Sequence, residues 1–297
     1  MKKLAAVLLT GVLAFGTLTG CGSSTEEAPA QDSTTEAEAG ETADEAGEAE
    51  AAGDLQVITV AASATPHAEI LEQAKPLLAE QGYDLQVTVF DDYVQPNMVV
   101  DSGDFDANYF QHKQYLEAFN EERGTDLANA GGIHYEPFGI YPSAKASLDE
   151  LSEGDTIAVP NDPTNEARAL LLLQDNGIIT LKEGAGLMAT VTDIVENPMN
   201  VEIVELEAAQ VPRVVGETSY VVMNGNYALQ AGYSVATDAL AYEQADSEAS
   251  QTYVNVIAVK AGNEESDAVK ALVDVLKSDE IAAYINDTYQ GAVIPVE

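Results

Sequence analysis

The chain is poor in cysteine, tryptophan and positive charge. It has one cysteine and no tryptophan in 297 residues, and its 12 lysines and arginines are outnumbered by 51 aspartates and glutamates, which gives a net charge of −39. A single cysteine excludes an internal disulfide and a cysteine-rich metal site. The negative charge repels phosphates and acidic lipid headgroups within a Debye length. We therefore expect no nucleic-acid binding and no electrostatic docking on an acidic membrane.

The sequence also lacks the motifs of common catalytic and cofactor sites. It contains no Gly-x-Ser-x-Gly nucleophile motif, no phosphate loop with Gly-Lys-Ser/Thr and no His-Glu-x-x-His zinc motif. Its three histidines, His67, His112 and His134, are scattered along the chain. These absences predict a protein that is not an enzyme and has neither a cofactor nor a metal centre.

The first 20 residues have the pattern of an export signal. Lys2 and Lys3 precede a largely apolar run, Leu4 to Leu18, which is too short to span a bilayer core of about 30 Å comfortably. The run ends in Leu-Thr-Gly-Cys at 18–21, which resembles the lipobox of bacterial lipoproteins. That resemblance implies cleavage before Cys21 and acylation of this cysteine, and two or more acyl chains anchor a protein stably. The alternative is an ordinary signal peptide with a chance cysteine.

Residues 21–53 have the composition of a disordered, acidic linker. After Cys21 they contain no large apolar residue, so the segment cannot offset the entropy cost of ordering. Helix is the alternative, because Ala and Glu favour it, but no apolar face is present to stabilise one. Residues 1–53 hold 10 acids and 2 bases, which leaves 51 − 10 = 41 acids and 12 − 2 = 10 bases for residues 54–297. The folded body therefore carries a net charge of 10 − 41 = −31.

Strand and helix patterns alternate through residues 54–297. The expected strands are 55–61, 85–90, 105–110, 134–141, 156–160, 201–206, 220–223 and 253–260. The expected helices are 66–81, 95–102, 112–124, 164–176 and 265–289. This alternation predicts α/β layers with largely parallel sheets, and its two series predict two lobes.

The segment Pro160–Arg168 ends an expected strand and begins an expected helix. Asp162 or Thr164 can cap this helix, and the free N–H groups of its first turn attract anions. Asn165 and Arg168 are three residues apart and share a face. A guanidinium group beside a helix N-terminus suits a carboxylate, because it can bind both oxygens. The alternative is a structural ion pair between Arg168 and one of the many acids.

Three further strand ends carry aromatic and amide side chains. Asp91–Asn97 follows one expected strand, and Asp106–His112 overlaps the end of another. Aromatic rings beside an amide and an imidazole can line an apolar slot with polar ends, although core packing is the alternative. Val221–Tyr227 is the third strand end, and it presents Asn224 beside a flexible glycine.

Seven stretches of the body occur in a characteristic order. They are PHAEIL (66–71), DYVQPN (92–97), DANYFQH (106–112), EPFGIY (136–141), PNDPTNEARAL (160–170), ELEAAQ (205–210) and NGNYA (224–228). With them, residues 54–297 resemble the methionine-binding lipoproteins, the NlpA-type substrate-binding components of ABC importers. The resemblance implies an α/β fold of two lobes, like that of periplasmic binding proteins, with a ligand cleft between them. Lobe 1 is expected at about 54–140 plus the C-terminal part, and lobe 2 at about 141–252.

The resemblance also implies a set of ligand-binding residues. Arg168 and Asn165 would hold the α-carboxylate of an amino acid, and Asn224 would hold its head group. The thioether pocket would be lined by Tyr93, Tyr109, Phe110 and His112. Glu136 and Tyr141, on the strand between the lobes, complete the set.

The function implied is capture of L-methionine by a monomeric, membrane-tethered protein on the extracytoplasmic face. Hinge closure would then present the ligand to an ABC permease and its ATPase. A thioether gains about 0.3–1.5 kcal/mol from each contact with an aromatic edge. The alternatives are a binder of another apolar amino acid, D-methionine or a methionyl peptide, or a surface lipoprotein that acts in adhesion or scaffolding.

Overall fold

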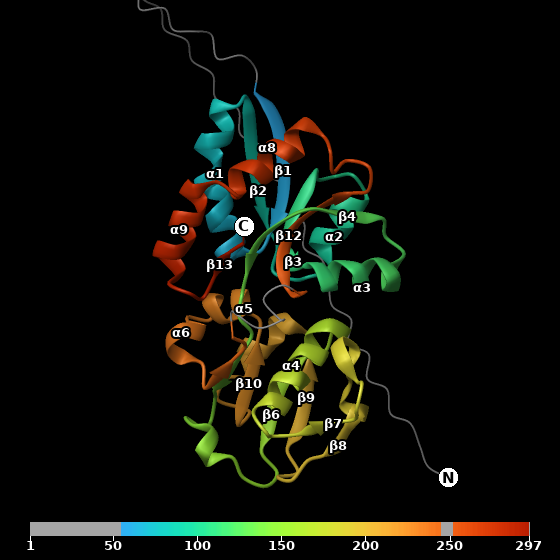
Figure 1. Cartoon of the computed structure of the whole chain (residues 1–297), viewed down its shortest axis with the longest axis vertical. Helices are drawn as coiled ribbons and strands as arrows, with labels where there is room; N and C mark the ends of the chain where they lie inside the picture. Colours follow the sequence, from blue (N-terminus) through green and yellow to red (C-terminus); the bar gives the residue numbers. More distant parts are fainter. Residues whose placement is uncertain (1–54, 245–251, 297) are drawn as a thin grey trace, which may run out of the picture. The chain divides into compact units, whose positions relative to one another are not determined.

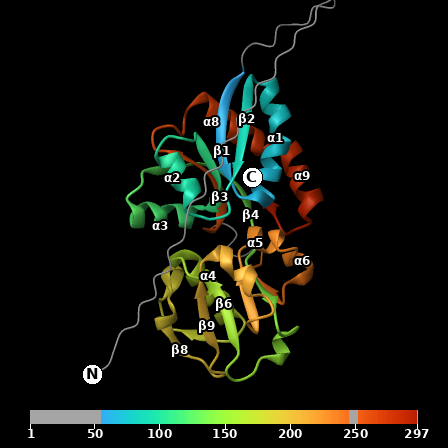
Figure 2. The ribbon, with the colours of Figure 1, turned by 180° about the vertical axis from the view of Figure 1, so that it is seen from behind.

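Two separate β-sheets organise the folded part of the chain. The computed structural model describes residues 55–244 and 252–296. The predicted signal peptide, Cys21 and the linker lie outside these residues. Contacts group Ala51–Glu297 into one compact unit, and within it each sheet has its own helices (Figure 1, and from behind in Figure 2). The predicted two-lobed α/β fold is confirmed.

The first sheet, which defines lobe 1, has six strands. In spatial order they are β13 (Ile294–Pro295), β4 (Leu127–Tyr135), β12 (Val254–Lys260), β3 (Ala107–His112), β1 (Gln56–Ala62) and β2 (Tyr83–Val89). β1 runs parallel to β2 and β3, whereas β12 runs antiparallel to β3 and β4. The expectation of largely parallel sheets is therefore wrong for this sheet, because β12, from the C-terminal part of the chain, returns between β3 and β4.

Helices cover both faces of this sheet. One face packs on α1 (Glu69–Glu80), α8 (Asp267–Leu276) and α9 (Asp279–Tyr289), and the other on α2 (Gln95–Asp101) and α3 (Lys113–Arg123). β12 alternates accordingly: Ile257 packs in the first cluster and Val256 in the second. Full burial of such a side chain contributes roughly 1.5–3 kcal/mol. Among the described residues, no helix is long and apolar enough to cross a membrane.

The second sheet, which defines lobe 2, has five strands. In spatial order they are β11 (Ala241–Tyr242), β5 (Gly139–Pro142), β10 (Tyr220–Met223), β6 (Thr156–Pro160) and β9 (Glu202–Leu206). Its helices are α4 (Pro163–Asp175), α5 (Gly225–Gln230) and α6 (Val235–Asp238). The 3₁₀ turns are η2 (Leu148–Glu150), η3 (Gly186–Met188), η4 (Val191–Asp193) and η5 (Ala208–Val214). A hairpin of β7 (Thr180–Leu181) and β8 (Ile194–Glu196) lies beside α4.

Two segments connect the lobes. Residues 136–138 lead from β4 to β5, and residues 243–253 lead from β11 to β12. The single long strand expected at 134–141 is therefore wrong. It divides into the end of β4 and all of β5, because each half pairs with a different sheet. The break places Glu136 between the lobes.

Candidate functional site

A small inner cavity of about 20 Å³ lies where strand ends from both lobes meet. Its lining residues come from the ends of β3, β4 and β10, the start of β12, the loop after β2 and the first turns of α3, α4 and α5. They are Tyr93, Phe110, Gln111, His112, Tyr115, Glu136, Asn165, Arg168, Asn224, Gly225, Asn226 and Asn255. Strand ends of α/β sheets are the usual place for a ligand site.

Lobe 1 contributes an aromatic wall to this cavity. The ring of Tyr93 lies 5.6 Å from those of Phe110 and Tyr115. Helix α2, which directly follows Tyr93 and Val94, is fixed to β3 by buried amides: Asn97 Nδ2 donates to Gln111 Oε1 over 2.9 Å, and Asn108 Nδ2 donates to Asn97 Oδ1 over 2.9 Å. These satisfied amides hold the wall rigid.

Lobe 2 contributes the first turn of α4, joined to lobe 1 through His112. The α4 N-cap is Asp162, whose carboxylate accepts from the backbone N–H and the side-chain amide of Asn165, each over 3.0 Å. The other end of that amide, Asn165 Oδ1, accepts from His112 Nε2 over 3.1 Å and from Asn224 Nδ2 over 2.8 Å. The amide of Asn165 thus links Asp162 and Asn224 of lobe 2 to His112 of lobe 1.

His112 is held as a neutral imidazole. Its Nδ1 accepts from the Tyr115 backbone N–H over 3.0 Å, which caps α3, so the proton resides on Nε2. Burial, and then the positive charge of Arg168, lower the pKa of His112 to about 3.

Two amide atoms at the start of α5 are buried without a hydrogen-bond partner in the described part of the chain. They are the acceptor Asn224 Oδ1 and the donor Asn226 Nδ2. Asn226 Oδ1 accepts from Tyr93 OH across the lobes over 2.5 Å, which fixes the orientation of the amide. An unpaired buried donor or acceptor costs about 1–3 kcal/mol, so this pair of atoms favours a ligand that offers both a donor and an acceptor.

Arg168 is almost fully buried, and one edge of its guanidinium is already paired. Nε donates to Glu243 Oε1 over 2.8 Å, and Nη2 donates to Glu243 Oε2 over 2.5 Å and to the Glu136 carbonyl over 2.9 Å. The rings of Tyr253 and Phe138 lie 4.2 and 4.8 Å from its central carbon. Burial lowers the pKa of Arg168, but the Glu243 carboxylate raises it more, so the net shift is upward and the group stays charged. The structural ion pair weighed in the sequence analysis is therefore present.

Gly225 allows the start of α5 to approach Glu136 closely. A Cβ atom on Gly225 would lie 2.7 Å from both Cβ and Oε2 of Glu136. The sequence suggested that this glycine supplies flexibility. The structure assigns it a different role, since Gly225 has no positive φ and is needed for the close approach.

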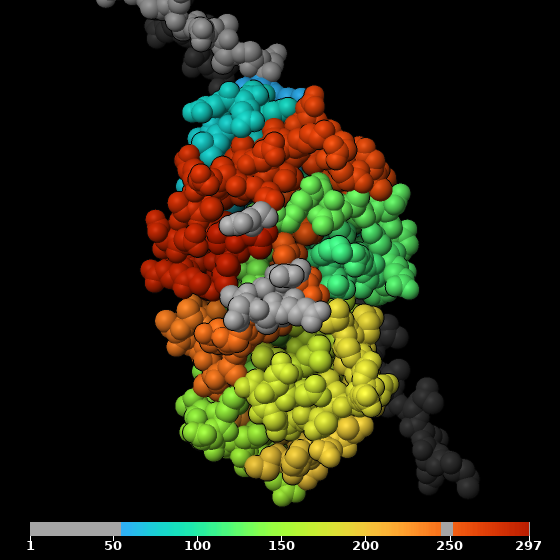
Figure 3. Space-filling view, in the orientation of Figure 1, coloured from blue at the N-terminus to red at the C-terminus, as the bar shows by residue number. Residues whose placement is uncertain are grey.

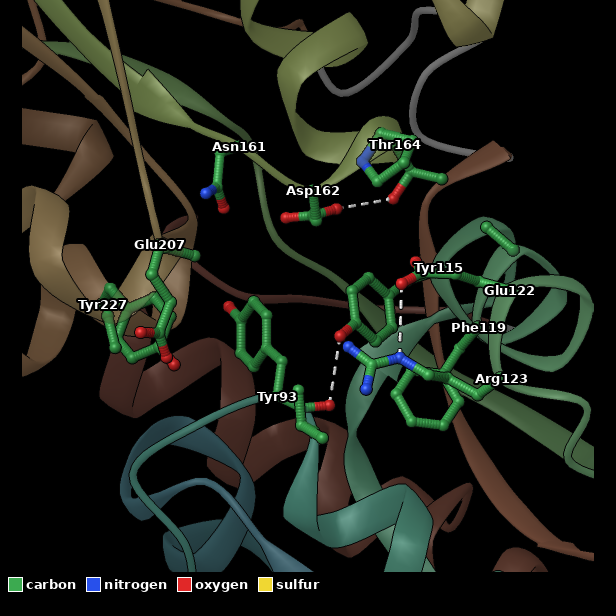
Figure 4. Close-up of a pocket in the computed structure, with 15 residues that line it drawn as sticks. Tyr93, Tyr115, Phe119, Glu122, Arg123, Asn161, Asp162, Thr164, Glu207 and Tyr227 are labelled. Carbon is green, nitrogen blue, oxygen red and sulfur yellow. Dashed lines mark hydrogen bonds and ion pairs between the residues drawn. The ribbon is translucent and has the colours of Figure 1, made fainter.

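A larger outer cavity of about 580 Å³ lies beside the inner one and shares Tyr93 and Tyr115 with it. Figure 4 shows these two rings in the middle of the view, with Asp162 above them and Arg123 to the lower right. Tyr227, also in its lining, donates to the Asp91 carbonyl over 3.0 Å and thus joins the lobes. In Figure 3 the red and green surface of lobe 1 meets the orange and yellow surface of lobe 2.

Known proteins share this fold and much of this sequence. The family described as NlpA lipoprotein matches residues 58–297. The chain belongs to the NlpA lipoprotein family.

Several relatives in this family have names that state a ligand. The D-methionine-binding lipoprotein MetQ of Salmonella typhimurium is 42% identical over 229 residues, which cover 76% of this chain and 83% of the relative. The methionine-binding lipoprotein MetQ of Bacillus subtilis is 42% identical over 245 residues, which cover 80% of this chain and 88% of the relative.

Solved structures agree with the computed fold. A crystal structure from Ruminococcus gnavus is 76% identical and matches with a TM-score of 0.81, over 82% of this chain and all of the other. A nutrient binding protein from Burkholderia cenocepacia, solved bound to methionine, is 42% identical, with a TM-score of 0.77 over 81% of this chain and all of the other. The two MetQ relatives and the Burkholderia cenocepacia protein are thus named as binding proteins and not as enzymes.

The structure brings most of the predicted site residues together. Those that line the inner cavity are Tyr93, Phe110, His112, Glu136, Asn165, Arg168 and Asn224. Tyr109 and Tyr141 do not line it. Tyr109 lies behind the wall, with its hydroxyl bonded to His134 Nδ1, and Tyr141 packs on Tyr233 at a ring distance of 5.7 Å. We therefore correct the placement of these two tyrosines: they lie behind the site rather than in its lining.

Sequence reasoning missed several residues of the site. Gln111 and Asn226 lie within matched stretches, so their position beside predicted residues was the available signal. Glu243 and Asn255 lie outside every matched stretch, and nothing in the sequence pointed to them. His67 and His134 were judged to be scattered, yet both contact Glu136.

Proposed function

We propose that this protein captures methionine in the inner cavity and delivers it to an ABC permease and its ATPase. The lobes separate to admit the ligand, because the cavity of about 20 Å³ has little more room than one water molecule needs. Closure then traps the amino acid, with each lobe providing one wall.

The observation that carries this proposal is the polarity of the inner cavity. Asn224 Oδ1 is a free acceptor suited to an ammonium group, and Asn226 Nδ2 is a free donor suited to a carboxylate. The cationic Arg168 and the Glu136 carboxyl group lie in the same lining. An α-amino acid presents both charges on adjacent atoms, so it matches this set.

The aromatic wall favours an unbranched, polarizable side chain. Tyr93, Phe110 and Tyr115 border the cavity, and a thioether packs well against ring edges. The names of the MetQ relatives and the methionine-bound structure from Burkholderia cenocepacia support methionine over leucine. One of these names states the D-isomer and the other names state no isomer, so the L-isomer is part of the proposal and not of the family assignment.

Delivery to a permease requires that the protein stay near the membrane. Acylation of Cys21 would anchor it on the extracytoplasmic face, and the acidic linker at 21–53 would let the folded body reach the permease as a monomer. The family description as a lipoprotein supports this anchor.

Isothermal titration calorimetry tests the proposal. Residues 51–297 are unfolded in denaturant, refolded and dialysed to remove any ligand carried over, then titrated with L-methionine, D-methionine and L-leucine. We expect one-to-one binding of L-methionine, with D-methionine and L-leucine weaker by roughly tenfold or more, as differences of about 1–3 kcal/mol predict. Tighter binding of D-methionine or L-leucine would assign that compound as the ligand in place of L-methionine. No heat of binding with any of the three would support the scaffold alternative.

A further inference from the structure

Two buried histidines converge on one oxygen of Glu136. His134 Nε2 lies 2.7 Å and His67 Nε2 lies 3.4 Å from Glu136 Oε1. His67 comes from the turn before α1, His134 from the end of β4, and Glu136 from the segment between the lobes. All three side chains are at most 5% exposed.

The hydrogen bonds define which nitrogens donate to the carboxylate. A neutral His134 that donates from Nε2 to the ionised Glu136 carboxylate has a free lone pair on Nδ1, which then accepts from Tyr109 OH. His67 Nε2 also lies 3.0 Å from Asn255 Oδ1, which can only accept, so this nitrogen carries a proton too. Burial is the main cause that lowers the pKa of His67 to about 4 and of His134 to about 3. Both imidazoles are therefore neutral donors at pH 7.

Neutral donors orient the Glu136 carboxyl group without supplying a positive charge. Burial raises the pKa of Glu136, while the charge of Arg168 and the backbone N–H of Asn226 oppose this rise, so a cation bound at the carboxyl group would favour its ionised form. In the described part of the chain, the ion-pair contacts of Glu136 are with these two histidines only. Arg168 bonds to the backbone carbonyl of Glu136, and its ion pair is with Glu243. A buried carboxylate without a cationic partner is costly, and a bound cation removes that cost.

The second oxygen of Glu136 faces the other lobe. Oε2 lies 2.7 Å from where a Cβ on Gly225 would be, so it approaches the start of α5, beside Asn224 and Asn226. The histidines hold Oε1, and Oε2 remains on the side of the inner cavity where Asn224 Oδ1 has no partner in the described chain.

We propose that His67 and His134 are positioning residues that fix the Glu136 carboxylate so that Oε2 receives the ammonium group of the bound amino acid. This inference rests on the proposed function. The same three side chains offer one ligand atom each within 4.8 Å of one another, so a zinc site is the competing assignment. The hydrogen bonds of Tyr109 and Asn255 to these imidazoles favour the positioning role.

A double-substitution cycle tests the inference on residues 22–297 expressed without the signal and Cys21. His134→Phe removes the donor, and Glu136→Gln removes the charge at nearly constant size. If His134 acts through Glu136, His134→Phe weakens L-methionine binding roughly tenfold in the wild-type background and less than about threefold in the Glu136→Gln background. In His134→Gln, the side-chain amide can donate from the position of Nε2. We therefore expect this variant to bind L-methionine within about threefold of the wild-type affinity, unlike His134→Phe.

Each other outcome overturns the inference or its basis. Equal losses in both backgrounds would mean that His134 only supports the fold, and no loss would mean that it has no role in binding. His67→Phe and His67→Gln repeat the cycle if His134→Phe does not fold. One-to-one binding of zinc by the EDTA-treated wild type, lost in His134→Gln, would assign the cluster to a metal. If wild type does not bind methionine at all, the proposed function fails before the cycle begins.

Discussion

Arg168 and Glu243 form a two-bond ion pair in which both side chains are nearly buried. The side chains are 4% and 10% exposed, and Glu243 also accepts from Tyr135 OH over 2.8 Å and from the Phe138 N–H over 3.1 Å. Tyr135 ends β4, Phe138 precedes β5, and Glu243 follows β11. The residue proposed to bind the ligand carboxylate is therefore tied to both segments that connect the lobes.

Arg168→Ala is expected to abolish methionine binding and also to destabilise the protein. Truncation leaves the Glu243 carboxylate buried without its partner, which costs roughly 3–5 kcal/mol of unfolding free energy. Urea unfolding and calorimetry on the same sample measure both effects. An unchanged affinity would contradict the carboxylate assignment.

A paired variant separates the two effects. Arg168→Met combined with Glu243→Gln removes both charges, so stability should recover by most of that loss while methionine binding stays absent. Recovery of binding in the double variant would show that Arg168 serves the fold alone.

Gly225→Ala is expected to weaken methionine binding by roughly tenfold or more while the unliganded protein keeps its fold. The added Cβ would overlap Glu136 Cβ and Oε2 at 2.7 Å, and overpacking of this kind costs about 1–3 kcal/mol. Glu136 lies just before β5 and Gly225 just after β10, which pair in one sheet, so the overlap displaces the Glu136 side chain from its place in the cavity lining. Calorimetry with L-methionine measures the affinity, and an unchanged affinity in this variant would refute the argument.

The sequence was sufficient for the longer elements other than β4 and for most of the cavity. It did not predict most of β4, the short elements β7, β8, β11, β13, α5 and α6, or the connections between the lobes. Helix α4 was predictable because Asp162, Pro163 and the apolar positions that follow act locally. The break at 136–138 was not, because the residues of EPFGIY form a continuous β-prone run and only pairing with two different sheets divides it. Glu243 was not predictable because its partner Arg168 is 75 residues away.

Within the site, Tyr109 is a residue whose position could not be predicted from the sequence. Phe110, Gln111 and His112 at the end of β3 all border the cavity, because the pairing of β3 with β12 shifts register at Phe110, between the pairs Tyr109–Ile257 and Gln111–Val256. Tyr109 instead packs edge-on against His67 at a ring distance of 4.7 Å. The sequence could not show this register shift, because it depends on how β3 pairs with the distant strand β12.

Tyr93→Phe is expected to weaken methionine binding by roughly three- to tenfold with little change in stability. The substitution removes the hydrogen bond from Tyr93 OH to Asn226 Oδ1, which is made across the lobes, and a typical net value for such a bond is about 0.5–1.5 kcal/mol. Tyr83→Phe on β2 is a matched control, because Tyr83 is not in the cavity lining and should leave affinity unchanged. Equal affinities for both variants would argue against closure through Tyr93.

Cys21→Ala is expected to release the protein from the membrane. The predicted acyl chains contribute about 0.8 kcal/mol per buried CH₂ group, and no helix in the described part of the chain can replace them as an anchor. Fractionation of cells that express wild type or Cys21→Ala measures the distribution. Retention of the variant in the membrane fraction would refute the lipoprotein anchor.

The three histidines are expected to stay neutral between pH 8 and pH 5 in the folded protein. Burial, the main cause, lowers the pKa of His67 to about 4 and those of His112 and His134 to about 3, below the ordinary value of 6.5. As the pH falls, the histidines of the unfolded chain take up protons near pH 6.5, before those of the folded protein do. The histidines therefore contribute fully to the free energy of unfolding above pH 6.5, and this contribution is lost as the pH falls toward 4 and below. Long-range ¹H–¹⁵N spectra resolve three imidazoles, since the chain has only three. Both His112 and His134 should show the Nε2–H tautomer, and a midpoint near 6.5 for any of the three would mean that its side chain is not buried as described.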